Sequence, residues 1–296
     1  MRTFRTIGAF ALAGAALLFA STAAAQQSEG EPYSRAIRKI KDGLYVVPGY
    51  DGATTGGNVG VRVTPDGILI VDSNKVENIA AVLQQIRTVS TLPIKYEIGT
   101  HSHADHSGGN GEVAKTGTVI IAHRAMREAM VKGNQAGPPT VVYDHELSVF
   151  LGAAEVRAYY FGPGHTDGDT VVYFPDAKVV QCGDLVLMGK RLDGSTMVPA
   201  INYPTGASLT KLIAAVDGIL SLDFDTAIPG HGPLMTRGQV QTYRQNLVTL
   251  KERLKQAIAG GVKKEEIAAK LKLDDLGWPF SAPQLTALYD EAAQER

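Results

Sequence analysis

The stretch His101-Ser102-His103-Ala104-Asp105-His106 directly follows residues 94–100, which are predicted to form a β-strand. In an extended segment residues two apart point to the same side, so His101 and His103 can bind one ion together. A turn after His103 can direct Asp105 and His106 towards a neighbouring point. Three histidines and one aspartate within six residues therefore predict a metal site rather than a solvated polar loop.

Three further tracts place a histidine or an aspartate just beyond a predicted strand. His165 follows the run 156–161, Asp184 follows the run 179–182, and His231 follows the run 226–228. All these side chains then lie at one rim of the sheets, although each tract is a weak signal by itself. Together with residues 101–106 they predict one convergent site.

Short β-like runs alternate with helical stretches through residues 41–236, which we assign to one catalytic domain. Strands are expected at 44–48, 58–64, 68–72, 94–100, 119–123, 147–151, 156–161, 170–174, 179–182 and 226–228. Helices are expected at 78–89, 112–115, 124–132 and 208–222, and in a C-terminal extension (237–296) at 238–259, 263–271 and 282–294. The turn at 65–67 is echoed at 175–177, and two hairpin-plus-helix halves would form a four-layer sandwich with helices outside two packed sheets.

The order of the motifs HSHADH, GHT, CGD and PGHG resembles that of the metallo-β-lactamase superfamily over roughly residues 40–235. The resemblance implies an α/β fold in four αββα layers and a binuclear site holding two Zn²⁺. It assigns the first ion to His101, His103 and His165. It assigns the second ion to Asp105, His106 and His231, with Asp184 bridging both. The tract 71–73 also matches a family segment whose aspartate, here Asp72, supports the site from outside the ligand set.

The donor types agree with this assignment, because imidazole and carboxylate groups suit Zn²⁺, although Fe or Mn can occupy such a site. Two cations that share a water lower its pKa from ~15.7 towards ~7, which yields hydroxide at neutral pH. We expect that hydroxide to attack a substrate carbonyl, with Asp105 as the catalytic residue that orients it and passes its proton on. No Gly-x-Ser-x-Gly elbow is present in the sequence, so no protein nucleophile is expected.

The aspartate at position 184 leaves the identity of the small-molecule substrate undecided. In many true β-lactamases of this superfamily the matching residue is cysteine or serine, whereas glyoxalase II-like thioesterases and lactonases have aspartate. The histidine-rich HSHADH and GHT motifs also occur in one group of the β-lactamases, which makes a β-lactam amide the leading candidate and a thioester, lactone or other ester the alternative. A diiron oxidoreductase or sulfur-handling relative is a second alternative, and a non-catalytic metal-binding role is a third.

The N-terminus has the pattern of an export signal. Arg2 and Arg5 precede an apolar run at 7–20, and Ala23 and Ala25 precede an expected cut before Gln26. An apolar run of this length is short of the ~20 residues that a spanning helix needs. We therefore expect a signal peptide at 1–25, a lead-in at 26–40, no membrane association after cleavage, and a periplasmic or secreted protein.

Composition narrows the class of protein further. The formal net charge is −1, with 29 Lys and Arg against 30 Asp and Glu, which gives no basic footprint for nucleic acid. The single cysteine, Cys182, excludes an intramolecular disulfide framework and a thiolate zinc knuckle. Its expected role is that of a small core residue. The oligomeric state is left open.

Residues outside the ligand set receive weaker assignments. His123 is expected to cap a helix or lie in the core, and His145 receives no role. Asn202 and Tyr203 are candidates for substrate hydrogen bonds, because substrate contacts often come from loops. The Gly-rich loop 50–58 is expected to overhang the site as a flap. Trp278 and Phe280 are expected to pack the extension onto the domain.

Overall fold

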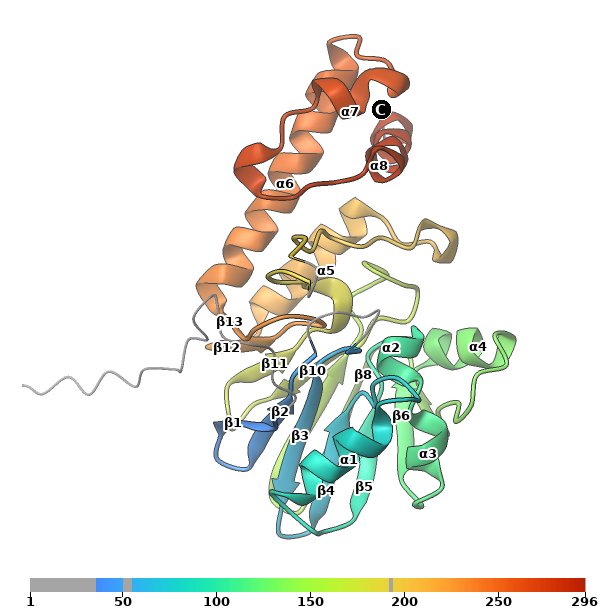
Figure 1. The fold of residues 1–296 in the computed structure, drawn as a ribbon, viewed down its shortest axis with the longest axis vertical. Helices are drawn as coiled ribbons and strands as arrows, with labels where there is room; N and C mark the ends of the chain where they lie inside the picture. The colour runs from blue at the N-terminus through green and yellow to red at the C-terminus, as the bar shows by residue number, and fades with distance from the viewer. Residues whose placement is uncertain (1–35, 50–54, 192–193, 296) are drawn as a thin grey trace, which may run out of the picture.

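The computed structural model describes residues 36–49, 55–191 and 194–295. It contains two β-sheets packed face to face, with helices on both outer surfaces (Figure 1). The expected signal peptide, most of the lead-in and part of the 50–58 loop lie outside the described residues. The predicted α/β class and the αββα layering are confirmed.

The first sheet has seven strands in the order of the chain, β1 to β7. Neighbours from β1 to β4 are antiparallel, and neighbours from β4 to β7 are parallel. The loops after β4 and β5 therefore leave at the same edge. The bounds are β1 Arg38–Lys41, β2 Leu44–Val47, β3 Val59–Thr64, β4 Gly67–Val71, β5 Ile94–Ile98, β6 Val119–His123 and β7 Val141–Tyr143.

The second sheet has six strands in the order β13-β12-β11-β10-β9-β8. β9 and β11 are both antiparallel to β10, so they run in the same direction. β12 is parallel to β11 and therefore shares this direction. The ends of β9, β11 and β12 thus share one edge. The bounds are β8 Glu146–Leu151, β9 Ala154–Tyr159, β10 Val171–Phe174, β11 Val179–Gln181, β12 Thr226–Ile228 and β13 Met235–Thr236.

Apolar side chains form three larger cores between the layers and one small cluster of Ala122, Met126 and Met130. One core lies between the sheets and includes Leu69, Ile98 and Phe174. A second packs helix α1 (Ile79–Arg87) on the first sheet, whose outer face also carries α3 (Asn110–Ala114) and α4 (Arg124–Lys132). The third and largest packs α5 (Leu209–Ser221) and the C-terminal helices on the second sheet. Strands such as β4 are buried along their whole length because they are covered on both faces.

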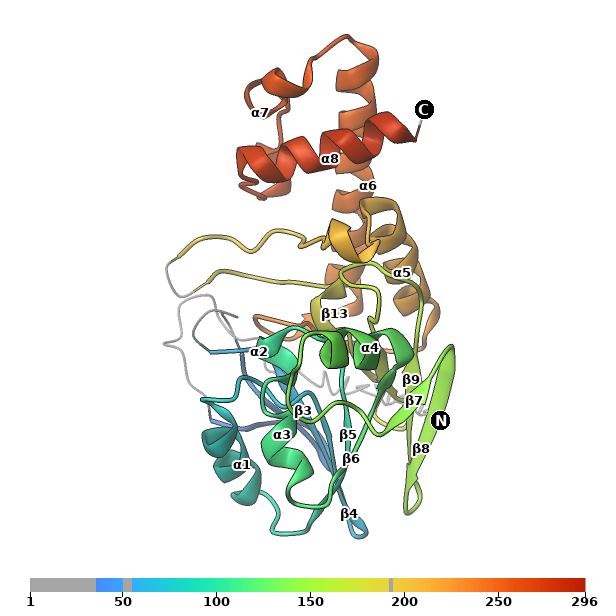
Figure 2. The same ribbon diagram turned by 90° about the vertical axis from the view of Figure 1, so that its right-hand side faces the viewer.

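The C-terminal extension consists of the long helix α6 (Arg237–Ala259), the short α7 (Ile267–Lys270) and α8 (Ala282–Gln294). A capping box between Thr236 and Gln239 starts α6. Figure 2 shows α8 lying across α6 at the end of the molecule beyond α5. Trp278 is buried in the shared core, where its ring contacts Tyr243 of α6 and Phe280, both within the extension. Among the described residues no helix is both long and apolar enough to cross a membrane.

Three strands differ from the sequence-based expectations. β1 begins at Arg38, inside the segment assigned to the lead-in, and β7 and β13 were not predicted. Strands of four residues or fewer at sheet edges are too short to show a two-residue period. Asp184 lies just beyond β11, as expected, in a 3₁₀ turn, Gly183–Leu185, in which Gly183 has φ +52°.

Candidate metal centre

The HSHADH motif bridges a strand and a helix at the edge where the two sheets meet. β5 ends at Ile98, and the four-residue helix α2 (Ala104–Ser107) begins after His103. This turn buries His101 and His106 almost completely and leaves His103 and Asp105 partly exposed. The predicted strand-then-turn geometry is therefore the one observed.

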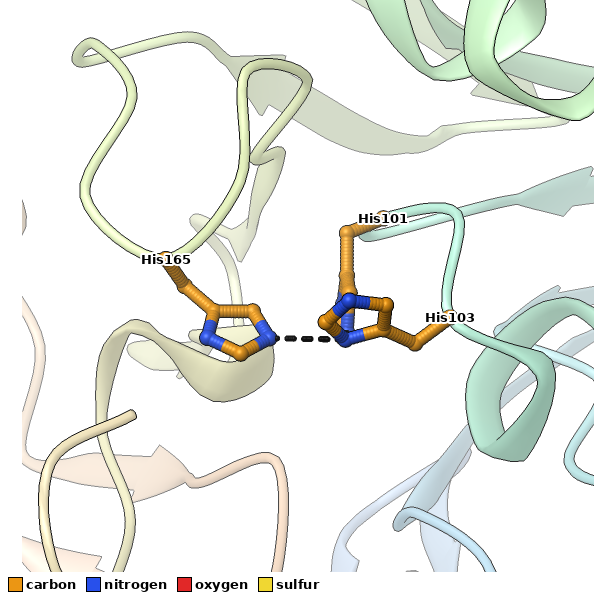
Figure 3. Close-up of side chains that lie close together, drawn as sticks. All are labelled: His101, His103 and His165. Atoms are coloured by element: carbon orange, nitrogen blue, oxygen red, sulfur yellow. Dashed lines mark hydrogen bonds between the residues drawn. The ribbon is translucent and has the colours of Figure 1, made fainter. Parts of the chain in front are cut away.

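Three histidines converge on one point. Nε2 of His101 lies 3.1 Å from Nδ1 of His103, and Nε2 of His165 lies 2.9 Å from the same atom. His165 reaches this point from the loop after β9, on the other sheet (Figure 3). The ring planes of the three pairs are nearly perpendicular, so nitrogen atoms rather than ring faces meet.

A second group lies beside the first and mixes carboxylate with imidazole. Nε2 of His106 is 3.1 Å from Nε2 of His231, which is in turn 3.2 Å from Oδ2 of Asp105. His231 comes from the loop after β12. The structure thus brings Asp105, His106 and His231 together, as the resemblance implies.

Asp184 lies between the two groups. Its Oδ1 is 3.1 Å from Nε2 of His106 and 3.4 Å from Nε2 of His231, while its Oδ2 is 3.6 Å from Nε2 of His165. The two oxygens therefore face different groups. Gly230 runs directly behind this carboxylate, and any Cβ there would collide with Oδ1.

The hydrogen bonds behind the histidines fix where their lone pairs point. Nδ1 of His165 donates to the carbonyl of Ala200 at 2.7 Å, because a carbonyl can only accept. Nδ1 of His106 donates to Asp72 at 2.8 Å for the same reason. In the neutral form of each ring, Nε2 is then the unprotonated nitrogen that faces the cluster, and this is the tautomer that binds a metal.

Nδ1 of His101 is also a hydrogen-bond donor, and Thr100 links it to Asp72. Thr100 donates its hydroxyl proton to Asp72 at 2.8 Å, so its oxygen accepts from Nδ1 of His101 at 3.1 Å. Asp72, which follows β4, therefore supports two of the predicted ligands, one directly and one through Thr100. It lies where the family resemblance placed it.

The donor set fits divalent cations. Ligand nitrogens around a tetrahedral Zn²⁺ at ~2.0–2.1 Å lie roughly 3.3 Å apart, close to the spacing of the three-histidine group. The candidate ligand atoms within each of three sets lie within 4.8 Å of one another: His101, His103 and His165; His101, His106 and Asp184; Asp105, His106 and His231. Among the described residues, Oδ1 of Asp184 and Nδ1 of His231 are buried without a hydrogen-bond partner. Unprotonated nitrogens and unpaired carboxylate oxygens packed together favour a cation at their centre.

The two halves of the site differ in their electrostatics. Burial, helped by neighbouring histidines, lowers the pKa of His101 well below its usual value and that of His103 to about 4. Burial opposes protonation of His231 too, but Asp184 and Asp105 outweigh it and raise the pKa of that ring to about 9. Asp105 shows the converse, since His106 and His231 outweigh burial and hold its pKa at about 2. The carboxylate half thus attracts positive charge, whereas His101 and His103 of the histidine half stay neutral.

Two supporting residues were missed at the sequence level. Buried Asp169 accepts hydrogen bonds from the backbone N–H groups of Gly164, His165 and Thr166 and from the Thr166 hydroxyl, and so fixes the loop that carries His165. A Thr-Asp-Gly-Asp turn after His165 was the available signal. Asn58 does the same for His231, since its amide donates to the carbonyls of Pro229 and Gly232.

The weaker assignments have mixed outcomes. His123 caps α4 by accepting a hydrogen bond from the N–H of Ala125. Its ring stacks on that of Tyr160 with the ring centroids 3.8 Å apart, which agrees with its expected structural role. Cys182 is a buried free thiol in the largest core and belongs to none of the candidate metal groups, as expected. Asn202 lies beside His103, with its amide 3.5 Å from Nε2. The Tyr203 hydroxyl donates to Glu291 of the extension.

Fold and site together define a four-layer αββα protein with a candidate binuclear metal centre at the common strand edge. A family profile described as the metallo-beta-lactamase superfamily matches residues 56–231, and the chain belongs to this superfamily. That membership and the histidine–aspartate cluster point to a metal-dependent hydrolase.

Relatives and solved structures support the same placement. The chain is 31% identical to the alpha subunit of a 2,4-dinitroanisole O-demethylase of Nocardioides sp. (strain JS1661), over 47% of this chain and 40% of that protein. It is 29% identical to a metallo-beta-lactamase type 2 of Elizabethkingia meningoseptica, over 53% of this chain and 64% of the enzyme. These matches span less than two thirds of either relative. A metallo-beta-lactamase from Pontibacter korlensis shares the fold with a TM-score of 0.62 at 22% identity, over 72% of this chain and 98% of that one.

Proposed function

We propose that this protein is an exported hydrolase that uses two divalent cations, Zn²⁺ foremost, to cleave a small carbonyl substrate. The observation that carries the proposal is the position of Asp184, whose two oxygens face the two groups of ligands at 3.1 to 3.6 Å. A carboxylate so placed can bridge two ions. Two such ions would supply water with a pKa near ~7 and a Lewis acid for the substrate oxygen.

The chain's own residues assign the face from which substrate approaches. Of the seven proposed ligands, His103 and Asp105 alone are partly exposed, and the side chain of Asp105 is 22% exposed. Asp105 therefore combines contact with the site and access to solvent. It is the group placed to accept a proton during attack and to release it to the leaving group or to water. Asn202, whose amide lies 3.5 Å from Nε2 of His103, is our candidate for a substrate hydrogen bond.

A β-lactam amide is the leading substrate. The family membership, two relatives named metallo-beta-lactamase type 2 and the export signal predicted at 1–25 support it. Aspartate rather than cysteine or serine at position 184 supports the alternative, a thioesterase or lactonase of glyoxalase II type. The O-demethylase relative adds an aryl methyl ether as a further probe compound.

The deciding experiment combines metal analysis with a substrate panel on the purified mature protein. Metal content near two ions per chain is expected, and content well below one ion would refute the binuclear site. Nitrocefin, S-lactoylglutathione, an acyl-homoserine lactone and 2,4-dinitroanisole are assayed side by side. Lactone or thioester turnover without β-lactam turnover would replace the leading substrate by its alternative.

Asp105→Ala tests the assigned role of that carboxylate. Loss of a general base costs ~10²–10⁴-fold in rate, so near-complete loss of hydrolysis is expected. Asp144→Ala is the matched control, because Asp144 forms an exposed ion pair with Arg124 away from the site. Full activity of the Asp105 variant would refute the proposed role of Asp105 in proton transfer.

Export is tested separately. The full chain should be secreted and cleaved before Gln26, which N-terminal sequencing of the secreted protein would show.

A further inference from the structure

A carboxylate of the C-terminal extension is bonded to the segment that follows the substrate-side loop. Glu291, on α8, accepts hydrogen bonds from the Tyr203 hydroxyl at 2.9 Å and from the backbone N–H groups of Leu209 at 2.9 Å and Thr210 at 3.0 Å. All three donors lie more than 80 residues earlier in the chain. One side chain thus holds both ends of the segment 203–210.

The N-terminus of α5 explains why a carboxylate is favoured there. The first N–H groups of a helix have no partner within the helix, and its positive end attracts anions. Ser208 satisfies the N–H of Lys211 but not those of Leu209 and Thr210, and the first turn of α5 contains no acidic residue. Glu291 supplies the missing negative charge from another element.

The segment held by Glu291 leads directly to the three-histidine group. The N–H of Asn202 donates to the carbonyl of His165 at 3.0 Å, and the carbonyl of Ala200 accepts from Nδ1 of the same histidine at 2.7 Å. Thr205 closes the turn by donating to the Asn202 carbonyl through its N–H and its hydroxyl. Displacement of this turn would therefore change the position and the tautomer of His165.

The helix that carries Glu291 is itself anchored. Glu295, one turn later, pairs with Lys251 at 2.8 Å and Lys255 at 3.0 Å, both on α6. Burial and the charge of Glu291 raise the pKa of Tyr203 above its usual range, so its hydroxyl remains a donor. All these residues except Tyr203 lie beyond the family region, which ends at residue 231.

We propose that Glu291 is a positioning residue of the metal centre, which holds the turn at Asn202 and through it the ring of His165. The inference rests on the proposed function for its activity readout alone. It makes the C-terminal extension part of the active-site apparatus rather than a separate appendage.

The test compares Glu291→Ala and Glu291→Gln with Asp290→Ala. Asp290 is the matched control, because it lies on the same helix and pairs with Lys264 at 2.5 Å within the extension. In metal-free protein, hydrogen exchange of the peptides covering 200–210 should accelerate at least tenfold in Glu291→Ala and remain unchanged in Asp290→Ala. Glu291→Gln keeps one acceptor oxygen and should fall between the two.

Co²⁺ serves as the probe of the metal centre. The affinity for Co²⁺ should fall about threefold to tenfold in Glu291→Ala, somewhat less than the 10–100-fold typical of groups that contact a ligand directly. Its visible spectrum should change, while that of Asp290→Ala should not. In the active protein kcat should fall more than KM rises.

Exchange and Co²⁺ binding in Glu291→Ala that equal those of Asp290→Ala would overturn the inference. If Glu291→Ala does not fold, Glu291→Gln carries the same comparison. Because exchange and Co²⁺ binding need no substrate, the inference can stand even if the proposed hydrolysis fails, and the reverse holds as well.

Discussion

The buried carboxyl group of Glu97 should make the stability of the protein depend on pH, and the size of this effect follows from its surroundings. It lies in β5, fully buried, and neither of its carboxyl oxygens has a hydrogen-bond partner within normal distance among the described residues. Burial, and then the negative charge of Asp72, raise the pKa of Glu97 from 4.5 to about 8, against a smaller opposite effect of the Ser73 hydroxyl. The folded chain therefore keeps this carboxyl protonated at pH values where the unfolded chain ionises it.

The sign and the size of the effect on stability follow from this difference. Because the pKa is higher in the folded state, the full contribution is present below pH 4.5 and is lost as pH rises towards 8. Each pKa unit corresponds to ~1.36 kcal/mol, so the loss between pH 5 and pH 8 is about 3 to 4 kcal/mol. Glu97→Gln cannot ionise and should escape this loss.

The assay is urea unfolding of both proteins at pH 5 and pH 8. Other titrating groups are common to both proteins and cancel when the two free energies of unfolding are subtracted. The variant should be near wild type at pH 5 and about 3 kcal/mol more stable at pH 8. Glu112→Gln, at an exposed position on α3, is the control and should follow wild type. Equal pH profiles for wild type and Glu97→Gln would refute the reasoning.

Three further predictions concern the site. Asp169→Ala leaves the buried N–H groups around His165 without an acceptor, so the free energy of unfolding should fall by about 2 to 4 kcal/mol in urea titrations; a loss under 0.5 kcal/mol would contradict this. Gly57→Ala would place a Cβ 2.6 Å from Nδ1 of His106, so metal affinity measured by calorimetry should fall about tenfold, with unchanged affinity counting against the close approach. Chelation should lower Tm, because free metal at ~100 times Kd contributes about 2.7 kcal/mol; equal Tm with and without chelator would argue against a bound ion.

Much of the architecture could be read from local patterns. The long strands and helices, including α5, α6 and α8, have enough residues to show a period of two or of 3.6. The histidine and aspartate tracts could be located because each follows a predicted strand. β7 and β13 were not predicted, because they are short edge strands that exist only through pairing with a neighbour.

The sequence by itself determined which residues can serve as ligands and that each lies just beyond a strand, because imidazole and carboxylate chemistry and the pattern of a strand are local properties. Only the tertiary structure decided how the ligands are held. Asp184 faces both groups from a 3₁₀ turn, Asp72 orients His106 across 34 residues, and Glu291 reaches the turn at Tyr203 across 88 residues. Such contacts depend on how separate elements pack against one another, and a local sequence pattern does not record that packing.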